Sequence, residues 1–375
     1  MKEKIRVAVL YGGKSGEHEV SLQSAASVIQ HLDRDRFDVV PVSIDKQGKW
    51  QWNDLRLIEE AKGRALPIFD DAPEMRLSPQ ADGRATLLPV IGSATSPRPI
   101  DVVFPMMHGP LYEDGAVQGV LELAGVAYVG SGVLSSAIGM DKDIAKRLAL
   151  FAGLPVLPYL ALAKRDYERD PARWAQAVRE KLTLPVFVKP CNMGSSVGVH
   201  KVKQWDALDA ALRDAFLYDV KVLVEQGIDV REIEVAVLEG EPLFVSVASE
   251  INANPKHEFY SYEAKYLDED GAIVDLPAKL DAAQMARVRQ LANDAFVALE
   301  CSGLARVDFF LDRQGGDFYF NEINTLPGFT SISMYPKMME ASGLPYRDLL
   351  SRLIELALEK QARKHGLKTD YQDQL

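Results

Sequence analysis

The chain has 375 residues and a formal net charge of −11, from 43 Lys and Arg against 54 Asp and Glu. This length predicts two or three domains with cores of ample size. The acidic balance, with no run of Lys or Arg, argues against nucleic acid or an anionic membrane as a partner. Two cysteines exclude a disulfide framework, and no stretch approaches the roughly 18 apolar residues of a membrane span. A cytoplasmic enzyme is therefore the leading expectation.

The first 140 residues alternate between strand-like and helix-like segments. Strands are expected at residues 5–10, 37–44 and 101–107, and helices at residues 21–32 and 116–124. Such alternation favours an α/β domain with a parallel sheet covered by helices. Residues 65–100 are rich in Pro, Gly, Ser and Asp, so we expect a long surface excursion of weak structure there.

The rest of the chain predicts a compact α+β unit followed by a second strand-rich region. Helices are expected at residues 141–152, 171–182, 205–217, 283–299 and 346–363, and strands at residues 156–162, 185–189, 197–202, 221–225, 232–238 and 243–247. Two further strands are expected in residues 304–324, which read as a β-hairpin around a Gln-Gly-Gly turn.

This hairpin carries two carboxylates at mirrored positions. With the turn centred on Gly315, Asp308 lies seven residues before it and Glu322 seven residues after it, so a symmetric register places them opposite each other. Strand alternation adds Arg306 and Asn324 to the same face. Opposed like charges destabilise a sheet unless a cation lies between them, and Mg²⁺ would serve. A slipped register would instead leave two solvated surface carboxylates.

A second segment combines a lysine with a glycine-rich loop. Lys189 ends an apolar strand and is followed by Gly194-Ser-Ser-Val-Gly198. Glycines let backbone N–H groups approach a phosphate, and the lysine supplies a point charge. The order of these residues does not match a Walker A loop, and a plain glycine-rich hairpin is the alternative.

Two loops of the N-terminal region also end strands and precede helices, where ligands of parallel sheets usually bind. The first contains Glu19, which would hold an ammonium group or act on the helix dipole. The second contains His108, Glu113 and Asp114, which would either bind a ligand or only stabilise the turn and cap the helix. His18 is expected to have a structural or solvated role.

Together these segments resemble the D-alanine–D-alanine ligases of the ATP-grasp superfamily, from Gly12 to about Leu358. The resemblance rests on five motifs in the family's order: His108-Gly-x-x-x-Glu-Asp-Gly-x-x-Gln-Gly119, Lys189-Pro with Gly194-Ser-Ser-Val-Gly198, Tyr262-Glu-Ala-Lys-Tyr266, Arg306-Val-Asp308 and Glu322-x-Asn-Thr-x-Pro-Gly328. It implies an N-terminal substrate-binding βα domain at 1–140, a central ATP-grasp domain at 141–228 and a C-terminal catalytic domain at 229–375. A homodimer is usual for the family.

The resemblance also implies a role for each matching residue. ATP would be bound by Lys142, Lys189, Ser195, Ser196, Glu225, Gln226, Ile228, Glu232 and Lys265. Two Mg²⁺ ions, which Mn²⁺ would replace, would be held by Asp308, Glu322 and Asn324. D-Alanine would be bound or activated by Glu19, His108, Ser195, Tyr266, Arg306, Gly328, Ser333 and Met334. Glu19, Ser195 and Tyr266 would form a triad that closes a mobile loop over residues 249–270.

The implied reaction joins two D-alanine molecules for peptidoglycan precursor synthesis through a D-alanyl phosphate, releasing ADP and phosphate. Two positions depart from the family pattern: Tyr112 replaces a usual glycine, and Gly227 replaces a bulkier residue. A bulky residue at 112 requires a negative φ or accepts strain.

Three alternatives remain open at this point. In the first alternative, the second substrate is D-lactate or D-serine instead of D-alanine, although Tyr266 favours the dipeptide product. The second alternative is a nicotinamide-dependent oxidoreductase, but Gly12, Gly13 and Gly16 do not complete the dinucleotide fingerprint. A nucleotide-binding module without catalysis is the third alternative, which the retained set of Arg306, Asp308, Glu322 and Asn324 disfavours.

Overall fold

The computed structural model describes residues 3–60, 65–69, 71–80, 84–90, 95–254, 256 and 272–368. It divides into two compact units, one of Met1–Val133 with Leu326–Leu375 and one of Leu134–Thr325. The three predicted domains have other bounds than these two units and stay a prediction. From Leu326 onward the chain belongs to the N-terminal unit.

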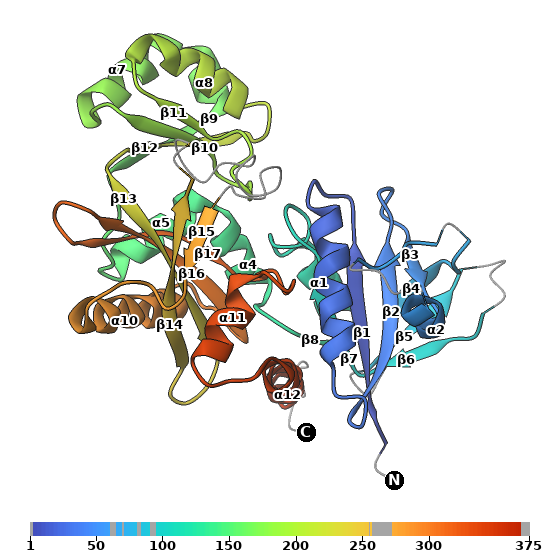
Figure 1. Ribbon diagram of the computed structural model, residues 1–375. Coiled ribbons are helices and arrows are strands. Elements are labelled where there is room, and N and C mark those ends of the chain that lie inside the picture. Colours follow the sequence, from blue (N-terminus) through green and yellow to red (C-terminus); the bar gives the residue numbers. More distant parts are fainter. Residues whose placement is uncertain are drawn as a thin grey trace, which may run out of the picture. The chain divides into compact units, whose positions relative to one another are not determined.

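The first unit is built on a five-stranded sheet in the order β3-β2-β1-β7-β8 (Figure 1). Strand β1 (Ile5–Gly12) runs parallel to β2 (Phe37–Ile44) and β7 (Val102–Met106). Its residues from 7 to 11 are all fully buried, and a continuous apolar run is typical of a strand covered on both faces. The predicted parallel sheet is confirmed. Other elements of this unit are β3 (Trp50–Trp52), β8 (Ala127–Tyr128), α1 (His18–His31), α2 (Leu55–Glu60), α3 (Ala116–Leu123), α11 (Met334–Ala341) and α12 (Tyr346–His365).

The weak structure expected for residues 65–100 is wrong over much of that range. Strands β4 (Met75–Pro79), β5 (Ala85–Pro89) and β6 (Arg98–Ile100) form a small antiparallel sheet. Ala85 and Leu87 alternate inward and join Met75 and Ile100 in the core of the unit. The strands are so short, and so rich in Pro, Arg and Ser, that no sustained period marks them in the sequence.

The second unit contains two antiparallel sheets (Figure 1). The four-stranded sheet has the order β11-β10-β12-β9, and the five-stranded sheet has the order β15-β14-β13-β16-β17. The strands of the first are β9 (Tyr159–Ala163), β10 (Val186–Pro190), β11 (His200–Val202) and β12 (Lys221–Gln226). The strands of the second are β13 (Val230–Leu238), β14 (Phe244–Ala253), β15 (Ala272–Asp275), β16 (Leu304–Asp312) and β17 (Phe318–Asn324). This mixed architecture confirms the predicted ATP-grasp fold.

Helices close the cores of both sheets. The four-stranded sheet packs against α6 (Lys164–Arg169), α7 (Pro171–Lys181), the 3₁₀ turn Trp205–Ala207 and α8 (Leu208–Ala215). The five-stranded sheet buries Ile233 and Val307 against α5 (Lys142–Phe151) and α10 (Ala282–Ala298). A short helix, α4 (Val133–Met140), leads into α5.

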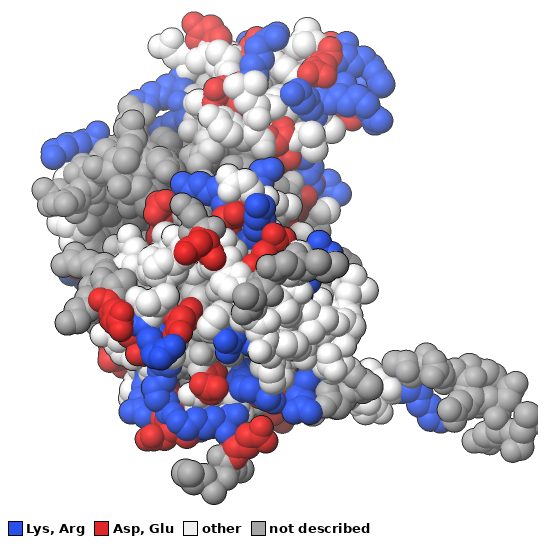
Figure 2. Space-filling view, turned by 90° about the vertical axis from the view of Figure 1, so that its right-hand side faces the viewer, with Lys and Arg blue, Asp and Glu red and all other residues white. Residues whose placement is uncertain are grey.

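Charge on the surface is mixed. Figure 2 shows acidic and basic side chains of the described residues interspersed over the visible face. No helix in the described ranges has the length and apolar character needed to cross a membrane.

Candidate active site

The phosphate side of the candidate site begins at the N-terminus of α5. Asp141 caps this helix by accepting hydrogen bonds from the N–H groups of Asp143 and Ile144, both at 3.1 Å. Lys142 is therefore the first helical residue. Its Nζ donates to the Met193 carbonyl at 2.7 Å and lies 3.1 Å from the Glu322 carboxylate. One ammonium thus contacts both the approach to the glycine-rich loop and the β16–β17 hairpin.

Lys189 lies at the end of β10 in a buried cluster of charges. Its Nζ is 2.6 Å from one carboxylate oxygen of Glu225, and the Nζ of Lys146 is 2.6 Å from the other. Burial opposes the ionisation of Glu225, but the two ammonium groups outweigh it and lower the pKa of Glu225 below its ordinary value. The cluster holds two cations and one anion, so it keeps one positive charge in excess for an anionic ligand.

The loop at residues 194–198 has an unusual backbone. Ser195 (φ 54°), Ser196 (φ 58°) and Gly198 (φ 68°) all adopt the left-handed region. A Cβ at Gly198 would lie 2.6 Å from the Tyr218 ring and 3.0 Å from Pro190, so this position requires glycine. Strained loops of this kind are concentrated at ligand sites, where they turn backbone N–H groups toward an anion.

The strand connection β12–β13 supplies the expected base-binding segment. The side chain of Gln226 is committed to Thr183, accepting from its N–H at 2.8 Å and donating to its carbonyl at 2.8 Å. Gly227 donates its N–H to the Pro185 carbonyl at 2.9 Å, and a Cβ there would lie 2.7 Å from that oxygen. The departure at Gly227 is thus a requirement of close packing. Ile228 is half-buried, and Glu232 lies on β13, paired with Ile251 and Phe310.

The β16–β17 hairpin has the predicted register at its open end. Asp308 pairs with Glu322 and Arg306 pairs with Asn324. The register shifts by one residue beyond Asp308, where Phe309 pairs with Phe320. This bulge compensates for a turn that is centred half a residue before Gly315, so the symmetric assignment holds where the polar residues lie.

Arg306 holds the acidic face of this hairpin together. Its guanidinium donates to both carboxylate oxygens of Asp308 at 2.8 and 2.7 Å, and its Nε lies 3.2 Å from Glu234. Burial works against its charge, but the carboxylates of Asp308 and Glu234 outweigh it, and the pKa of Arg306 is held well above its ordinary value. Arg306 is therefore a permanent cation at a fixed position.

The donor set on this face fits a hard divalent cation. Two carboxylates and one amide, from Asp308, Glu322 and Asn324, extend from paired strands, and oxygen donors are what Mg²⁺ prefers. Within the described residues, no three His, Cys, Asp or Glu side chains gather closely enough to form a metal cluster of their own. A cation at this face would therefore take further ligands from outside the chain, such as phosphate oxygens.

In the N-terminal unit, the loop after β1 places Glu19 at the start of α1. Glu19 is 69% exposed and lies 3.5 Å from the ammonium of Lys46. His18 is buried, and its Nδ1 lies 2.7 Å from the Gly13 carbonyl, which agrees with the expected structural role. A carboxylate this exposed at a helix N-terminus is accessible to a small ligand, which would compete with Lys46 for it.

His108 is buried behind the loop that follows β7. Its Nδ1 lies 3.5 Å from Glu113, and its Nε2 lies 3.2 Å from the Ser24 hydroxyl. Burial disfavours the imidazolium, but the neighbouring carboxylate of Glu113 outweighs it and raises the pKa of His108. Asp114 serves the turn, accepting from the N–H groups of Leu111 and Ala116.

Tyr112, at the usual glycine position, avoids the left-handed region. Leu111 adopts it instead, with φ 75°. The Tyr112 ring packs where a Cβ of Gly13 would stand, and its hydroxyl accepts the N–H of Lys14 at 2.8 Å. Tyr112 therefore ties the loop after β7 to the loop after β1, and the strain moves to its neighbour.

The segment that follows β17 brings the last predicted substrate residues together. A Cβ at Gly328 would lie 2.8 Å from the Ser333 hydroxyl, so the two residues are adjacent. The next N–H, of Phe329, donates to Ser24 at 3.3 Å. Ser333 is the N-cap of α11, and Met334 is its first residue. Helix N-termini attract carboxylates.

The lid residues Lys265 and Tyr266 lie outside the described residues, as does most of the predicted mobile loop. The triad of Glu19, Ser195 and Tyr266 therefore stays a prediction. Glu19 belongs to the first unit and Ser195 to the second.

Sequence reasoning missed two charged residues of the site, Lys146 and Glu234. Each follows a predicted residue at the period of its element: Lys146 is four residues after Lys142 on α5, and Glu234 is two residues after Glu232 on β13. This shared-face spacing was the available signal.

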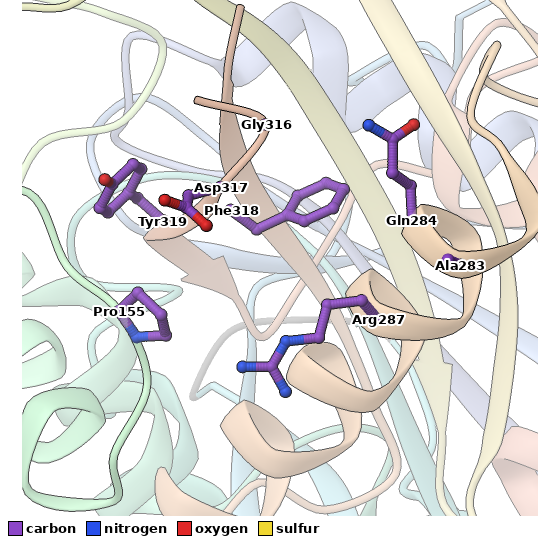
Figure 3. A pocket seen from close by; sticks show the side chains of 8 residues that line it. All are labelled: Pro155, Ala283, Gln284, Arg287, Gly316, Asp317, Phe318 and Tyr319. Carbon is purple, nitrogen blue, oxygen red and sulfur yellow. The ribbon is translucent and has the colours of Figure 1, made fainter. Parts of the chain in front are cut away.

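A pocket of about 460 Å³ also opens in the second unit (Figure 3). Its lining contains none of the predicted site residues and consists of Pro155, Ala283, Gln284, Arg287, Gly316, Asp317, Phe318 and Tyr319. It is a separate surface feature beside α10 and the hairpin turn.

Comparison with known proteins accounts for nearly the whole chain. Residues 6–131 match the family described as "D-ala D-ala ligase N-terminus" and residues 148–355 match "D-ala D-ala ligase C-terminus". The D-alanine–D-alanine ligase A of Bradyrhizobium diazoefficiens is 69% identical over 99% of this chain and 100% of its own length.

Solved structures agree with this match. The VanG D-Ala:D-Ser ligase of Enterococcus faecalis has a TM-score of 0.80 at 35% identity, over 95% of this chain and 100% of that one. The D-alanine–D-alanine ligase of Coxiella burnetii has a TM-score of 0.78 at 35% identity, over 97% and 96%. With its sheets, its motifs and its full length accounted for, the chain belongs to the D-alanine–D-alanine ligase family.

Proposed function

We propose that this chain joins two D-alanine molecules to D-alanyl-D-alanine with ATP, releasing ADP and phosphate, as a step of peptidoglycan precursor synthesis. The observation that carries the proposal is the face formed by Arg306, Asp308, Glu322 and Asn324, with Lys142 in contact with Glu322. The full-length match to the D-alanine–D-alanine ligase A of Bradyrhizobium diazoefficiens supports the choice of substrates.

In the first step, the carboxylate of one D-alanine attacks the γ-phosphate of ATP to give an acyl phosphate. Phosphoryl transfer depends on positioning and charge neutralisation more than on a protein nucleophile. Lys142 and Lys189 supply two cations, and the 194–198 loop supplies backbone donors. The predicted Lys265 would add a third cation, and Ser195 and Ser196 would bind phosphate oxygens.

Asp308, Glu322 and Asn324 would hold Mg²⁺, with Mn²⁺ as a substitute and two ions in all. When bound, the metal would neutralise charge on the phosphates. Among the chain's own groups, Arg306 orients Asp308 by a two-point hydrogen bond and supplies the positive charge that faces its carboxylate.

In the second step, the amine of the other D-alanine attacks the acyl phosphate carbonyl and phosphate leaves. Developing negative charge on that oxygen needs fixed donors, for which Arg306 and the N–H of Gly328 are proposed. Glu19 would hold the first ammonium group, and Ser333 and Met334 at the N-terminus of α11 would receive the second carboxylate. His108 would line this substrate site beside Glu113.

D-Serine or D-lactate as the second substrate is the alternative. The VanG structure is named a D-Ala:D-Ser ligase and is 35% identical to this chain. Tyr266, in the lid, favours the dipeptide. A homodimer in the cytoplasm, where ATP is supplied, completes the proposal.

Phosphate release from ATP and Mg²⁺ tests it directly. The mixtures contain D-alanine alone, L-alanine alone, D-alanine with D-serine, and D-alanine with D-lactate at two pH values. Release with D-alanine alone, together with D-alanyl-D-alanine in the product, is expected. Release only after D-lactate or D-serine is added would reassign the second substrate, and no release in any mixture would overturn the function.

A further inference from the structure

A third lysine of the second unit lies between the two sheets of the candidate site. Lys146 is on α5, one turn after Lys142, and its side chain is 1% exposed. Its Nζ is 2.6 Å from the Glu225 carboxylate on β12 and donates to the Phe320 carbonyl on β17 at 3.2 Å. Phe320 precedes Glu322 by two residues on the same strand. One ammonium therefore joins the strand of the base-binding segment to the strand of the proposed metal ligands.

The charge balance of this cluster depends on Lys146. Glu225 is 1% exposed and is shared between Lys146 and Lys189, each at 2.6 Å. If Lys189 turns toward a phosphate, Glu225 keeps Lys146 as its counter-ion. Without Lys146, the same movement would leave a buried carboxylate with no cation, and uncompensated buried charges are strongly unfavourable.

Lys146 can be the counter-ion of Glu225 only while its amine is protonated. Burial lowers the pKa of Lys146, and the charge of Glu225 opposes that effect. Arginine stays protonated in any such environment, so it separates the need for a charge at this position from the need for a lysine.

We propose that Lys146 is a positioning residue for nucleotide binding: it keeps Glu225 paired, so that Lys189 is released to the nucleotide phosphates. This rests on the proposed function only in that the ligand is ATP or ADP. Lys146 does not touch the reacting atoms in this arrangement and acts through Glu225 and Lys189.

Lys146→Met tests the proposal, because methionine keeps the approximate size and removes the charge. We expect the Kd for ADP with Mg²⁺, measured by calorimetry on the full chain, to rise at least tenfold. KM for ATP should rise in parallel, whereas KM for D-alanine should stay within about twofold. A purely structural lysine would not separate the two KM values.

The matched control is Arg147→Met, which removes the next cation of the same helix. Arg147 is 63% exposed and pairs with Asp143, away from Glu225. We expect its Kd for ADP to stay within about twofold of the wild type. Lys146→Arg should recover most of the affinity that Lys146→Met loses.

A double-mutant cycle with Glu225→Gln isolates the coupling. In the Glu225→Gln background, Lys146→Met should change the ADP Kd by less than about threefold, because no buried carboxylate remains that could lose its counter-ion. An unchanged Kd in folded Lys146→Met, or an equal loss in both backgrounds, overturns the proposal.

Thermal melting without nucleotide shows whether each variant is folded. Should Lys146→Met fail to fold, Lys146→Gln takes its place, since it keeps a donor for the Phe320 carbonyl. If both fail alone and also with Glu225→Gln, Lys146 is a structural residue and the proposal is overturned. Wild-type protein that binds ADP but does not ligate D-alanine would refute the proposed function and leave this inference standing.

Discussion

Gly198→Ala would disturb the phosphate loop through two separate effects. The backbone at 198 is left-handed (φ 68°), a conformation that costs an L-residue about 1–2 kcal/mol. The new Cβ would also lie 2.6 Å from the Tyr218 ring and 3.0 Å from Pro190, and overpacking typically costs about 1–3 kcal/mol. Tyr218 is 46% exposed, so its ring has room to swing away and the lower end of that range applies. We expect a total loss of about 2–3 kcal/mol in the free energy of unfolding.

Because the clash pushes the loop as well as the ring, nucleotide binding should suffer too. We expect KM for ATP to rise about tenfold, which corresponds to about 1.4 kcal/mol. Chemical denaturation and phosphate-release kinetics measure the two effects on the same protein.

Gly316→Ala is the matched control for Gly198→Ala. Gly316 has φ 75°, and no atom beyond its two chain neighbours lies within 4 Å of the place its Cβ would take, so the substitution carries the backbone cost alone. Gly316→Ala should lower the free energy of unfolding by about 1 kcal/mol and leave KM for ATP unchanged. Adding Tyr218→Ala to Gly198→Ala should remove the overpacking share. If Gly198→Ala resembles Gly316→Ala in both stability and KM, the loop is neither tightly packed nor part of the phosphate site.

Three further predictions concern single side chains. Glu322→Gln should lower turnover by at least two orders of magnitude with a stability change below about 1 kcal/mol, since its ion pair with Lys142 is partly exposed; near-normal phosphate release would remove Glu322 from the metal site. Burial raises the pKa of the Cys191 thiol to about 12, so at pH 8 iodoacetamide should spare it in the native protein and label it after denaturation; peptide mass spectrometry would expose an error by finding native labelling. Glu113→Gln should lower the pKa of His108, because Glu113 favours the imidazolium; an NMR titration of the imidazole C–H signal that stays unchanged would contradict the pairing.

The polar hairpin shows how far strand alternation can predict a site. The pairing of Asp308 with Glu322 follows from residue spacing around a glycine turn, and the structure confirms it. The bulge after Asp308 was not predictable, since it depends on how the turn closes. The pairing was still predicted correctly, because the bulge offsets the half-residue error in the assumed centre of the turn.

The sequence did not predict the roles of Lys146 and Glu234, for a different physical reason. Lys146 reads as one more polar residue of an amphipathic helix, and its meaning comes from Glu225 and Phe320, which are distant in sequence. Arg306 was predicted as an oxyanion donor, but its pairing with Glu234 required the neighbour order of β13 and β16. Long-range strand order is what a single sequence leaves open.

The pairing of charges explains how such an acidic chain can present a site for a polyphosphate. In the described part of the second unit, Asp308 faces Arg306, Glu322 faces Lys142, and Glu225 faces two lysines. Each carboxylate therefore has a cation before any ligand arrives, which limits the cost of burying it. A ligand that brings phosphates and a divalent cation together would exchange these partners: its phosphates attract the lysines, and its cation takes their place on the carboxylates. On this argument neither component should bind tightly alone, and ADP affinity should fall steeply when Mg²⁺ is chelated.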